Sequence, residues 1–329
     1  MTHPRASLLA TLLSLSCLGA AMSVGGLSFG GAESVAAQEP PARFVGGLTS
    51  AEIETALREA HIDNFRTVGT SSVTFQLQLT GPIDGAFKPE TTSHRRGWLN
   101  EVAAYRIAAA LGMDSVPPVV ARVVDRGQFL RRLDPEYSGD WDVLIGRIVF
   151  GTGGVRGSVS YWVPNLTRAG DLDQSAGLLR WTSWLEVGSE IPDDSVALAR
   201  DLSTMAVFDL LIGNPDRASG GNMRTVETDG VVRLVIRDHN LAFAAHPGAS
   251  QLDRMIAMLR RVHRFPREFV ERLIALDEAR LRAVTQDELA GPLLDDAQIA
   301  AVLMRRDTAL SWIGSLIEQH GQDAVLSFE

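Results

Sequence analysis

Cysteine is nearly missing from this chain of 329 residues. The single one, Cys17, lies in an apolar stretch that follows one early positive charge and ends near Ala21. Small residues continue from there to Ala37, and the whole pattern is typical of a secretory signal peptide. We therefore expect residues 1–37 to be removed by cleavage after Ala37, and the protein to be secreted or periplasmic. The mature chain would then have no thiol, which excludes disulfide bonds and cysteine-bound metals.

Long apolar runs and an excess of positive charge are missing too. After residue 37, no segment of the sequence is apolar enough over sufficient length to span a membrane. The net charge of −9 argues against nucleic acid as a partner. With 45% hydrophobic residues, the chain is expected to be globular. About 290 residues would remain after cleavage, which is enough for two lobes or one large domain.

Lysine is as scarce as cysteine. Among 31 lysines and arginines only Lys88 is a lysine, which suggests a position that arginine cannot fill. A compact ammonium on a flexible stem reaches between phosphate oxygens and a carboxylate, where a planar guanidinium does not fit. Thirteen residues later, Glu101 lies on an alanine-rich helix expected over residues 98–112, with Gly112 as its stop. Kinases hold nucleotide phosphates with such a strand lysine paired to a helix glutamate. The alternative is that Lys88 is a chance survivor and Glu101 a solvated helix residue.

Two aspartates in the second half of the chain are expected to meet across a hairpin. An apolar helix over residues 193–211 leads into a polar loop that contains Asp216, and a strand over residues 231–236 leads to Asp238. Phosphoryl transfer needs an acceptor for the substrate hydroxyl proton and oxygen ligands for divalent metal ions. Asp216 suits the first task, and Asp238 with Asn222 suits the second, with Mg²⁺ or Mn²⁺ as the metal. Taken alone, this stretch is better explained by an ordinary Asn-Pro-Asp turn followed by a strand.

Taken in order, these motifs resemble the secreted Golgi casein kinase family and its atypical relatives, the phosphatidylinositol kinases and the HipA-type toxin kinases. The resemblance covers roughly residues 65–245 and rests on Phe87-Lys88-Pro89, the Glu101 helix, Val116-Pro117-Pro118, Leu211-Ile212-Gly213-Asn214-Pro215-Asp216-Arg217 and Asp238-His239-Asn240. It implies that Lys88 and Glu101 hold the phosphates of ATP. It further implies that Asp216 is the catalytic aspartate and Asp238 a metal ligand.

The sequence departs from the pattern of these relatives at two positions. Relatives usually place the second metal ligand five residues after the catalytic aspartate, where this chain has Gly221, and Asn222 comes one residue later. Relatives also tend to have glycine two residues after the metal aspartate, where this chain has Asn240. Asparagine tolerates left-handed backbone better than other non-glycine residues, so we expect the second change to be mild. The first change leaves the role of Asn222 open.

The first half of the expected mature chain is rich in strands. Residues 38–48 are interpreted as a linker, and a capping box at Thr49 starts a short helix. Period-two alternation predicts a hairpin over residues 65–79, whose tip would be either a lid over phosphates or a plain turn. Further strands are expected over residues 116–124, 143–150 and 158–164. The tip of the hairpin consists of Gly69, Thr70 and Ser71. The backbone of Tyr161, Trp162 and Val163 falls at the position along the chain where a kinase connects its lobes and binds adenine.

The second half of the chain reads as helical. Asp201 and Asp209, on the helix before Asp216, are expected to be solvated or paired with arginines. Further helices are expected over residues 255–262, 268–284 and 298–318, with Arg260-Arg261 and Arg305-Arg306 on solvated faces. The predicted fold class is α+β, a bilobal atypical protein-kinase-like fold. Its antiparallel-sheet N-lobe would span residues 49–164, and its mainly helical C-lobe residues 165–329.

The sequence thus predicts a secreted kinase that transfers the γ-phosphoryl group of ATP to a hydroxyl group of a protein or glycan. A kinase for a lipid or small molecule would use the same residues. A pseudokinase that binds nucleotide without catalysis is suggested by the shifted Asn222 and by Asn240. A secreted helical binding module with accidental motif matches is a further alternative, and failure to bind any nucleotide would favour it.

Overall fold

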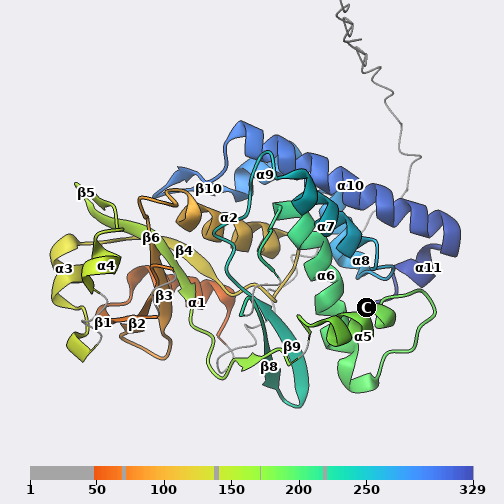
Figure 1. Cartoon of the computed structure of the whole chain (residues 1–329), viewed down its shortest axis with the longest axis horizontal. Helices are drawn as coiled ribbons and strands as arrows, with labels where there is room; N and C mark the ends of the chain where they lie inside the picture. Colours follow the sequence, from red (N-terminus) through yellow and green to blue (C-terminus); the bar gives the residue numbers. More distant parts are fainter. Residues whose placement is uncertain (1–47, 69–71, 137–140, 171, 218–220, 329) are drawn as a thin grey trace, which may run out of the picture. The chain divides into compact units, whose positions relative to one another are not determined.

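A computed structural model of the protein describes residues 48–328, apart from residues 69–71, 137–140, 171 and 218–220. The predicted signal peptide, its cleavage site and nearly all of the predicted linker therefore lie outside the described residues, as do Gly69, Thr70 and Ser71 at the hairpin tip. Figure 1 shows the arrangement of helices and strands along the chain. No helix within the described ranges is both long and apolar enough to cross a bilayer.

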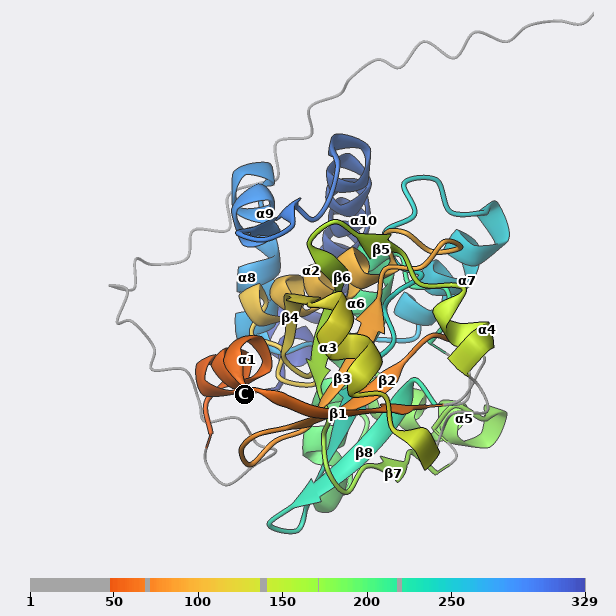
Figure 2. The same ribbon diagram turned by 90° about the vertical axis from the view of Figure 1, so that its left-hand side faces the viewer.

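An antiparallel sheet forms from the first half of the chain, as predicted. Its strands follow the order β1-β2-β3-β6-β4, with β5 paired to the end of β6. The strands are β1 (Ile62–Thr67), β2 (Phe75–Leu79), β3 (Gly85–Pro89), β4 (Val119–Val124), β5 (Phe150–Gly151) and β6 (Gly154–Tyr161). Helix α1 (Ser50–Glu59) begins with the predicted capping box at Thr49, and α3 (Arg126–Arg131) lies in front of the sheet in Figure 2.

Alternating side chains of this sheet form a hydrophobic core together with side chains of the helices around it, among them Phe129 of α3. Phe65, Phe75, Phe87 and Phe129 are fully buried and meet edge to face, with ring centroids of Phe65 and Phe129 5.0 Å apart. Edge-to-face contacts between buried aromatic rings add to the free energy gained by burying their surface. This packing fixes β3, the strand that carries Lys88, because Phe87 is its immediate neighbour and faces the core.

The prediction of a strand over residues 143–150 is wrong for most of these residues. Helix α4 (Trp141–Ile145) occupies its first part, and only Phe150–Gly151 pairs as a strand. Leu144 is fully buried whereas the adjacent Val143 is 62% exposed. Because a short apolar run has no clear period, its residues alone do not distinguish a buried strand from a helical turn.

Strand β6 approaches the Lys88 strand closely at Gly157. A Cβ atom on Gly157 would lie 2.5 Å from the backbone oxygen of Lys88 and 2.5 Å from the ring of Phe87. Gly157 and Pro89 are partners in the β3–β6 register, so either strand would have to move. We expect Gly157→Ala to lower the free energy of unfolding by about 1–3 kcal/mol, as overpacking of a filled core does. Urea denaturation tests this. Gly153→Ala is the control, because that position has open space around it, and equal stability of the two variants would contradict the prediction.

A second core gathers the apolar residues of most helices. Its centre is α6 (Val196–Ile212), which is buried almost all round, as expected for a helix that is apolar on every side. Helix α2 (Gly97–Ala110) contributes its apolar side chains to this core, and its predicted stop is confirmed, since Gly112 has a φ of +73°. The other helices are α5 (Ser175–Trp184), α7 (Ala249–Leu259), α8 (Arg267–Ile274), α9 (Glu278–Val284), α10 (Asp296–His320) and α11 (Gln322–Val325).

A three-stranded sheet lies beside these helices. It contains β7 (Thr167–Arg168), β8 (Met223–Thr228) and β9 (Val231–Ile236), and β8 and β9 form the predicted hairpin. Leu234 and Ile236 join the helical core, whereas Val235 joins the core of the first sheet. The pair β10 (Gln286–Asp287) and β11 (Gly291–Pro292) completes the fold. The division into lobes at residues 164 and 165 stays a prediction.

Arg305 corrects one further expectation about the helices. It was expected on a solvated face, but it is 1% exposed and donates hydrogen bonds to the backbone oxygens of Leu211, at 2.9 Å, and Ala244, at 3.1 Å. Burial lowers the pKa of its guanidinium to about 10. The position is favourable because the free carbonyls at the end of a helix attract a cation, and Leu211 lies in the last turn of α6.

Candidate active site

Lys88 joins two carboxylates that come from distant parts of the chain. Its Nζ lies 2.5 Å from Oε1 of Glu101 and 2.7 Å from Oδ1 of Asp238. Strand β3 carries the lysine, α2 carries the glutamate, and the aspartate follows β9 (Figure 1). The predicted pairing of Lys88 with Glu101 is therefore present in the structure, and the hairpin does bring Asp238 to the same point.

The pKa values of Lys88 and Glu101 favour the charged forms of both side chains. Burial on its own would lower the pKa of Lys88, but the charges of Glu101 and Asp238 raise it above its ordinary value. Burial would likewise raise the pKa of Glu101, which is outweighed by the charge of Lys88 and by the hydrogen bond from His239, so that this pKa is lowered. An ammonium and two carboxylates at hydrogen-bonding distance stabilise one another's charges.

The backbone at Asp238 has an unusual conformation. Its φ is +66°, in the left-handed region, and the neighbouring backbone N–H of His239 donates to Oε2 of Glu101 at 3.1 Å. Asn240 is not among the described residues with positive φ, so the asparagine at this position does not have to adopt left-handed backbone. The side-chain amide of Asn100 instead donates to the backbone oxygens of Asn240 and Ala242, each at 2.9 Å. Helix α2 thus fixes the loop after Asp238 through Asn100 and Glu101.

A cavity of about 550 Å³ opens beside the Lys88 cluster. Lys88, Glu101 and Asp238 line it. Tyr161, Trp162 and Val163, predicted to bind adenine, line the same cavity. Its apolar lining includes Val68, Ala86, Val116, Pro117, Val119, Leu166, Val235 and Ile236. A cavity with an apolar wall and a charged end has the form of a site for a small ligand with an apolar ring and an ionic group.

The three residues predicted at the adenine end differ in their backbone hydrogen bonds. The N–H of Tyr161 donates to the oxygen of Pro118 at 2.8 Å, and that of Trp162 to the oxygen of Asp84 at 3.0 Å. Neither N–H is therefore available to a base, which leaves Val163 as the candidate donor among the three. The side chain of Tyr161 is buried, and burial raises its pKa to about 12. Near the tip of the first hairpin, Ser72 and Thr74 line the cavity on either side of Val73.

Asp216 and Asn222 contact one another, and neither lines this cavity. The amide nitrogen of Asn222 donates to the backbone oxygen of Asp216 at 2.8 Å and to Oδ2 at 3.2 Å. The side chain of Asn214 accepts from the backbone N–H of Asp216 at 3.1 Å. Asn222 therefore positions Asp216, despite the extra residue Gly221 before it. Its predicted role as a metal ligand, and the catalytic role of Asp216, stay predictions.

The sequence analysis gave Arg217 no role of its own. Its guanidinium makes a two-pronged ion pair with Asp209 of α6, with Nε 2.9 Å from Oδ2 and Nη2 2.8 Å from Oδ1. It also donates to the backbone oxygens of Asn222 and Arg237, at 2.9 and 3.0 Å, and to Nε2 of His239 at 3.1 Å. Arg217 thus connects the loop of Asp216 to the chain on both sides of Asp238. The expectation that Asp209 pairs with an arginine is confirmed.

His239 connects the two halves of the site in its neutral form. Burial lowers the pKa of His239 below its ordinary value, although Glu101 beside it acts in the opposite direction. Because Nε2 accepts from Arg217, the ring proton belongs on Nδ1, which faces Glu101 Oε2 at 3.6 Å. The sequence analysis assigned no role to His239. The neighbouring Asp238 was the only signal for it.

The chemistry of Asp238 fits one divalent metal ion. Its side chain is 34% exposed at the cavity, and a carboxylate oxygen is the ligand that Mg²⁺ and Mn²⁺ prefer. Within the described ranges no group of three or more acidic, histidine or cysteine side chains could hold a metal ion. Magnesium is usually bound by one or two carboxylates together with substrate phosphates and water, so a preformed cluster is not required.

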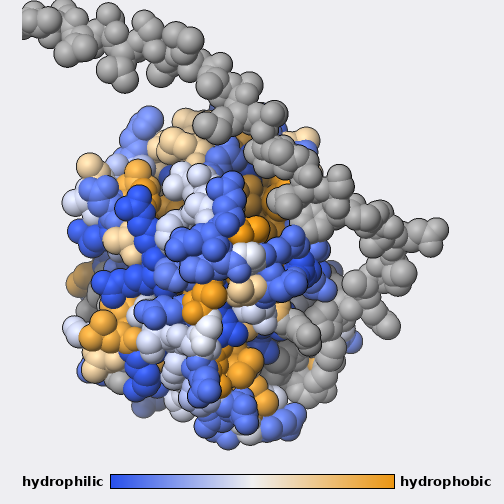
Figure 3. Space-filling model, turned by 90° about the vertical axis from the view of Figure 1, so that its right-hand side faces the viewer, coloured by the Kyte–Doolittle hydropathy of each residue, from blue (hydrophilic) through white to orange (hydrophobic). Residues whose placement is uncertain are grey.

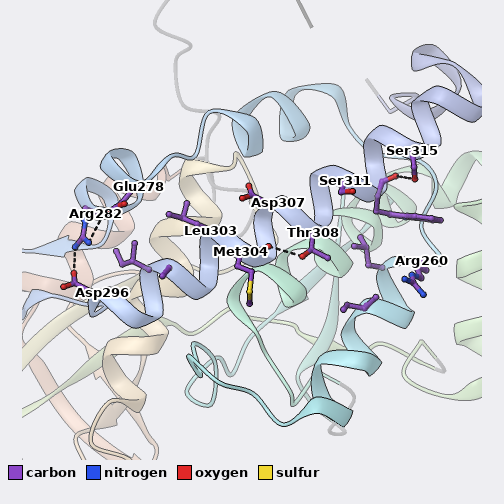
Figure 4. Close-up of a pocket in the computed structure, with 15 residues that line it drawn as sticks. Arg260, Glu278, Arg282, Asp296, Leu303, Met304, Asp307, Thr308, Ser311 and Ser315 are labelled. Carbon is purple, nitrogen blue, oxygen red and sulfur yellow. Dashed lines mark hydrogen bonds and ion pairs between the residues drawn. The ribbon is translucent and has the colours of Figure 1, made fainter. Parts of the chain in front are cut away.

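A larger hollow of about 860 Å³ lies elsewhere, along α10 between α7 and α9. Figure 4 shows Arg282 between Glu278 and Asp296 at one end of it, and both are ion pairs at 2.8 Å. None of the predicted site residues lines it. The face of the molecule in Figure 3 is mostly hydrophilic where it is visible, with hydrophobic residues in small separate groups. Because Lys88, Glu101 and Asp238 line the smaller cavity and not this hollow, the smaller cavity is the candidate active site.

The chain has the α+β fold of the atypical kinases, as its likeness to solved structures shows. Among solved structures, the chain is similar to the Golgi casein kinase with Mn/ADP bound, with a TM-score of 0.62 and 16% identity over 84% of this chain and 78% of that one. A second structure of the Golgi casein kinase matches with a TM-score of 0.63 and 17% identity over 84% and 77% of the two chains.

The Fam20 protein of hydra, solved with sugar, is similar as well. Its TM-score is 0.60 and its identity 14%, over 84% of this chain and 91% of that chain. No protein-family model and no curated protein matches the sequence. The resemblance to the Golgi casein kinases stated from the sequence is thus confirmed for the fold, as is the predicted α+β fold class.

Proposed function

We propose that this protein is an atypical kinase that transfers the γ-phosphoryl group of ATP to a hydroxyl group of a protein or glycan. The observation that carries the proposal is the contact of Lys88 with both Glu101 and Asp238 at the charged end of a cavity with an apolar wall. The solved Golgi casein kinase with Mn/ADP and the hydra protein with sugar support a nucleotide, a metal ion and a glycan as partners.

Each residue of the site has a task in this proposal. Lys88 binds phosphate oxygens of ATP, and Glu101 holds the ammonium in place. Asp238 would hold Mg²⁺ or Mn²⁺, and the metal would neutralise charge on the phosphates. The apolar wall would receive the adenine ring, with the backbone of Val163 as its polar contact.

Asp216 would accept the proton of the acceptor hydroxyl as that oxygen attacks the γ-phosphorus. Its carboxylate is held by Asn222 at 3.2 Å, and its backbone by Asn214. Correct placement of such a base contributes to the rate because the reacting groups are already oriented. Asp216 is half-buried and does not line the cavity, which suits a group that contacts the acceptor more than the nucleotide.

Turnover of γ-labelled ATP by the purified chain expected after cleavage, residues 38–329, tests the proposal. In the presence of Mg²⁺ or Mn²⁺ we expect label to be released as phosphate or transferred to an added protein or glycan. Nucleotide binding is measured on the same protein with the same metal ions. If the protein neither turns over nor binds the nucleotide, the proposal is contradicted and a binding module is favoured.

A pseudokinase is the second candidate, because the amide nitrogen of Asn222 faces Asp216 and Asp238 already contacts Lys88. Nucleotide binding without turnover, in the presence of both metals and a range of acceptors, would favour this candidate. Transfer to a lipid or small molecule alone would keep the kinase and correct its acceptor.

A further inference from the structure

Two arginines converge on one backbone oxygen in the candidate nucleotide cavity. The Nε atoms of Arg224 and Arg237 both donate to the oxygen of Gly221, at 3.3 and 3.0 Å. Both side chains line the same cavity as Lys88 and Asp238. Two guanidinium groups that share a single acceptor lie close together, and their positive charges repel each other.

The strand register places these side chains on one face of the sheet. Arg224 is the β8 partner of Val235 on β9, and Arg237 lies two residues after Val235. Because successive side chains of an extended chain alternate between faces, Val235 and Arg237 project from the same side. On the other neighbouring strand, Arg168 is the β7 partner of Arg224. Like charges directly opposite each other on a sheet are destabilising, so this face gains from a bound anion.

The cavity has too few carboxylates to neutralise these cations. Within the described part of the chain neither Arg224 nor Arg237 forms an ion pair, whereas Arg217 and Arg233 pair with Asp209 and Asp201. The carboxylates that line the cavity, Glu101 and Asp238, both contact Lys88. The lining therefore has three cations against two carboxylates, in a chain whose net charge is −9. An excess of positive charge in a concave site of an acidic protein favours an anionic ligand.

We propose that Arg224 and Arg237 together bind a phosphate group in this cavity. Their free N–H groups are suited to a phosphate, since the planar guanidinium binds two of its oxygens at once. The inference rests on the proposed nucleotide site and assigns its phosphate end to the arginine pair as well as to Lys88. The nucleotide is one source of the phosphate group, and a phosphorylated acceptor is another.

Binding of ATP, adenosine and inorganic tripolyphosphate to Arg224→Gln, Arg237→Gln and the double variant tests this proposal. Isothermal titration at one fixed ionic strength gives the dissociation constants. We expect each substitution to weaken ATP and tripolyphosphate about tenfold, the usual loss for a hydrogen bond to a charged group, and to leave adenosine unchanged. Arg261→Gln is the control, because Arg261 is exposed and lines none of the described cavities, and it should leave all three ligands unchanged.

Thermal unfolding separates binding from a structural role. Because each substitution removes a repelled charge, the variants should unfold at the same or a higher temperature without ligand. Arg224→Lys with Arg237→Lys keeps the charges and should recover part of the affinity. A fall in unfolding temperature together with unchanged tripolyphosphate affinity would overturn the proposal and leave the arginines a structural role.

The three ligands distinguish this proposal from the proposed function. Weaker tripolyphosphate binding with unchanged ATP binding would support the phosphate site and assign it to the acceptor. A wild-type protein that binds tripolyphosphate through the arginines but does not bind ATP would overturn the proposed kinase and support the arginine pair. If the wild type binds neither ligand, both proposals are overturned.

Discussion

Replacing Asp238 with asparagine is expected to abolish phosphoryl transfer while the protein stays folded. Asp238 is the more exposed of the two carboxylates at the charged end of the cavity, and in the proposed mechanism it holds the divalent metal. Groups that neutralise charge on a transferring phosphoryl group contribute on the order of 10³-fold or more to the rate. An asparagine has no charge to offer a metal, so we expect turnover to fall by at least that factor.

Asparagine is the right replacement because of the backbone at this position. With a φ of +66°, Asp238 lies in a region that asparagine and aspartate tolerate and alanine does not, so an alanine variant would add strain to the loss of charge. Asp229→Asn is the matched control. Asp229 has a φ of +53° in the turn between β8 and β9, is exposed, and lines none of the described cavities. Its variant should retain wild-type turnover.

Release of label from γ-labelled ATP, measured with the wild type and both variants, tests the predicted loss of turnover. Turnover by Asp238→Asn within tenfold of the wild type would remove Asp238 from the mechanism. A variant of Lys88 is a less clean test, because without the ammonium Glu101 and Asp238 would lose the cation that both contact. Loss of activity in such a variant could follow from a disturbed fold as well as from lost phosphate contacts.

The lysine cluster could be predicted from the sequence because each member had a local signal. Lys88 was the one lysine in an arginine-rich chain, and Glu101 followed on an unmistakable alanine-rich helix. The turn before β9 then fixed the direction in which Asp238 returns. The antiparallel pairing of β8 with β9 required only alternation and a turn, which are properties of neighbouring residues.

The residues that hold the helix, loop and hairpin of the site together had no such signal in the sequence. Arg217 contacts Asp209, Asn222, Arg237 and His239, and these contacts depend on how a helix end, a loop and a hairpin pack. The left-handed backbone at Asp238 and the burial of Arg305 have the same origin. Each is decided by a partner distant in the chain, so neither propensity nor period could reveal it.

Replacing Arg217 with methionine is expected to be the most destabilising of the substitutions considered. Asp209 is 8% exposed, and without Arg217 its carboxylate would retain only the 3.3 Å contact with the amide of Asn214 among its side-chain partners in the described structure. Removal of one partner from a buried ion pair leaves an unpaired charge and costs about 3–5 kcal/mol. The free energy of unfolding, measured in urea, should fall by that amount. Arg272→Met breaks an exposed pair with Glu268 and should cost less than about 1 kcal/mol.

A second substitution separates the stability of this pair from its role in the site. Asp209→Asn combined with Arg217→Met removes the buried charge together with its partner, so the double variant should be more stable than Arg217→Met alone. Its turnover of ATP should nevertheless stay low, because Arg217 also holds the backbone oxygens of Asn222 and Arg237 on either side of the site. If the double variant recovers both stability and turnover, Arg217 is only a partner for Asp209. If stability alone recovers, Arg217 positions Asp216 relative to Asp238.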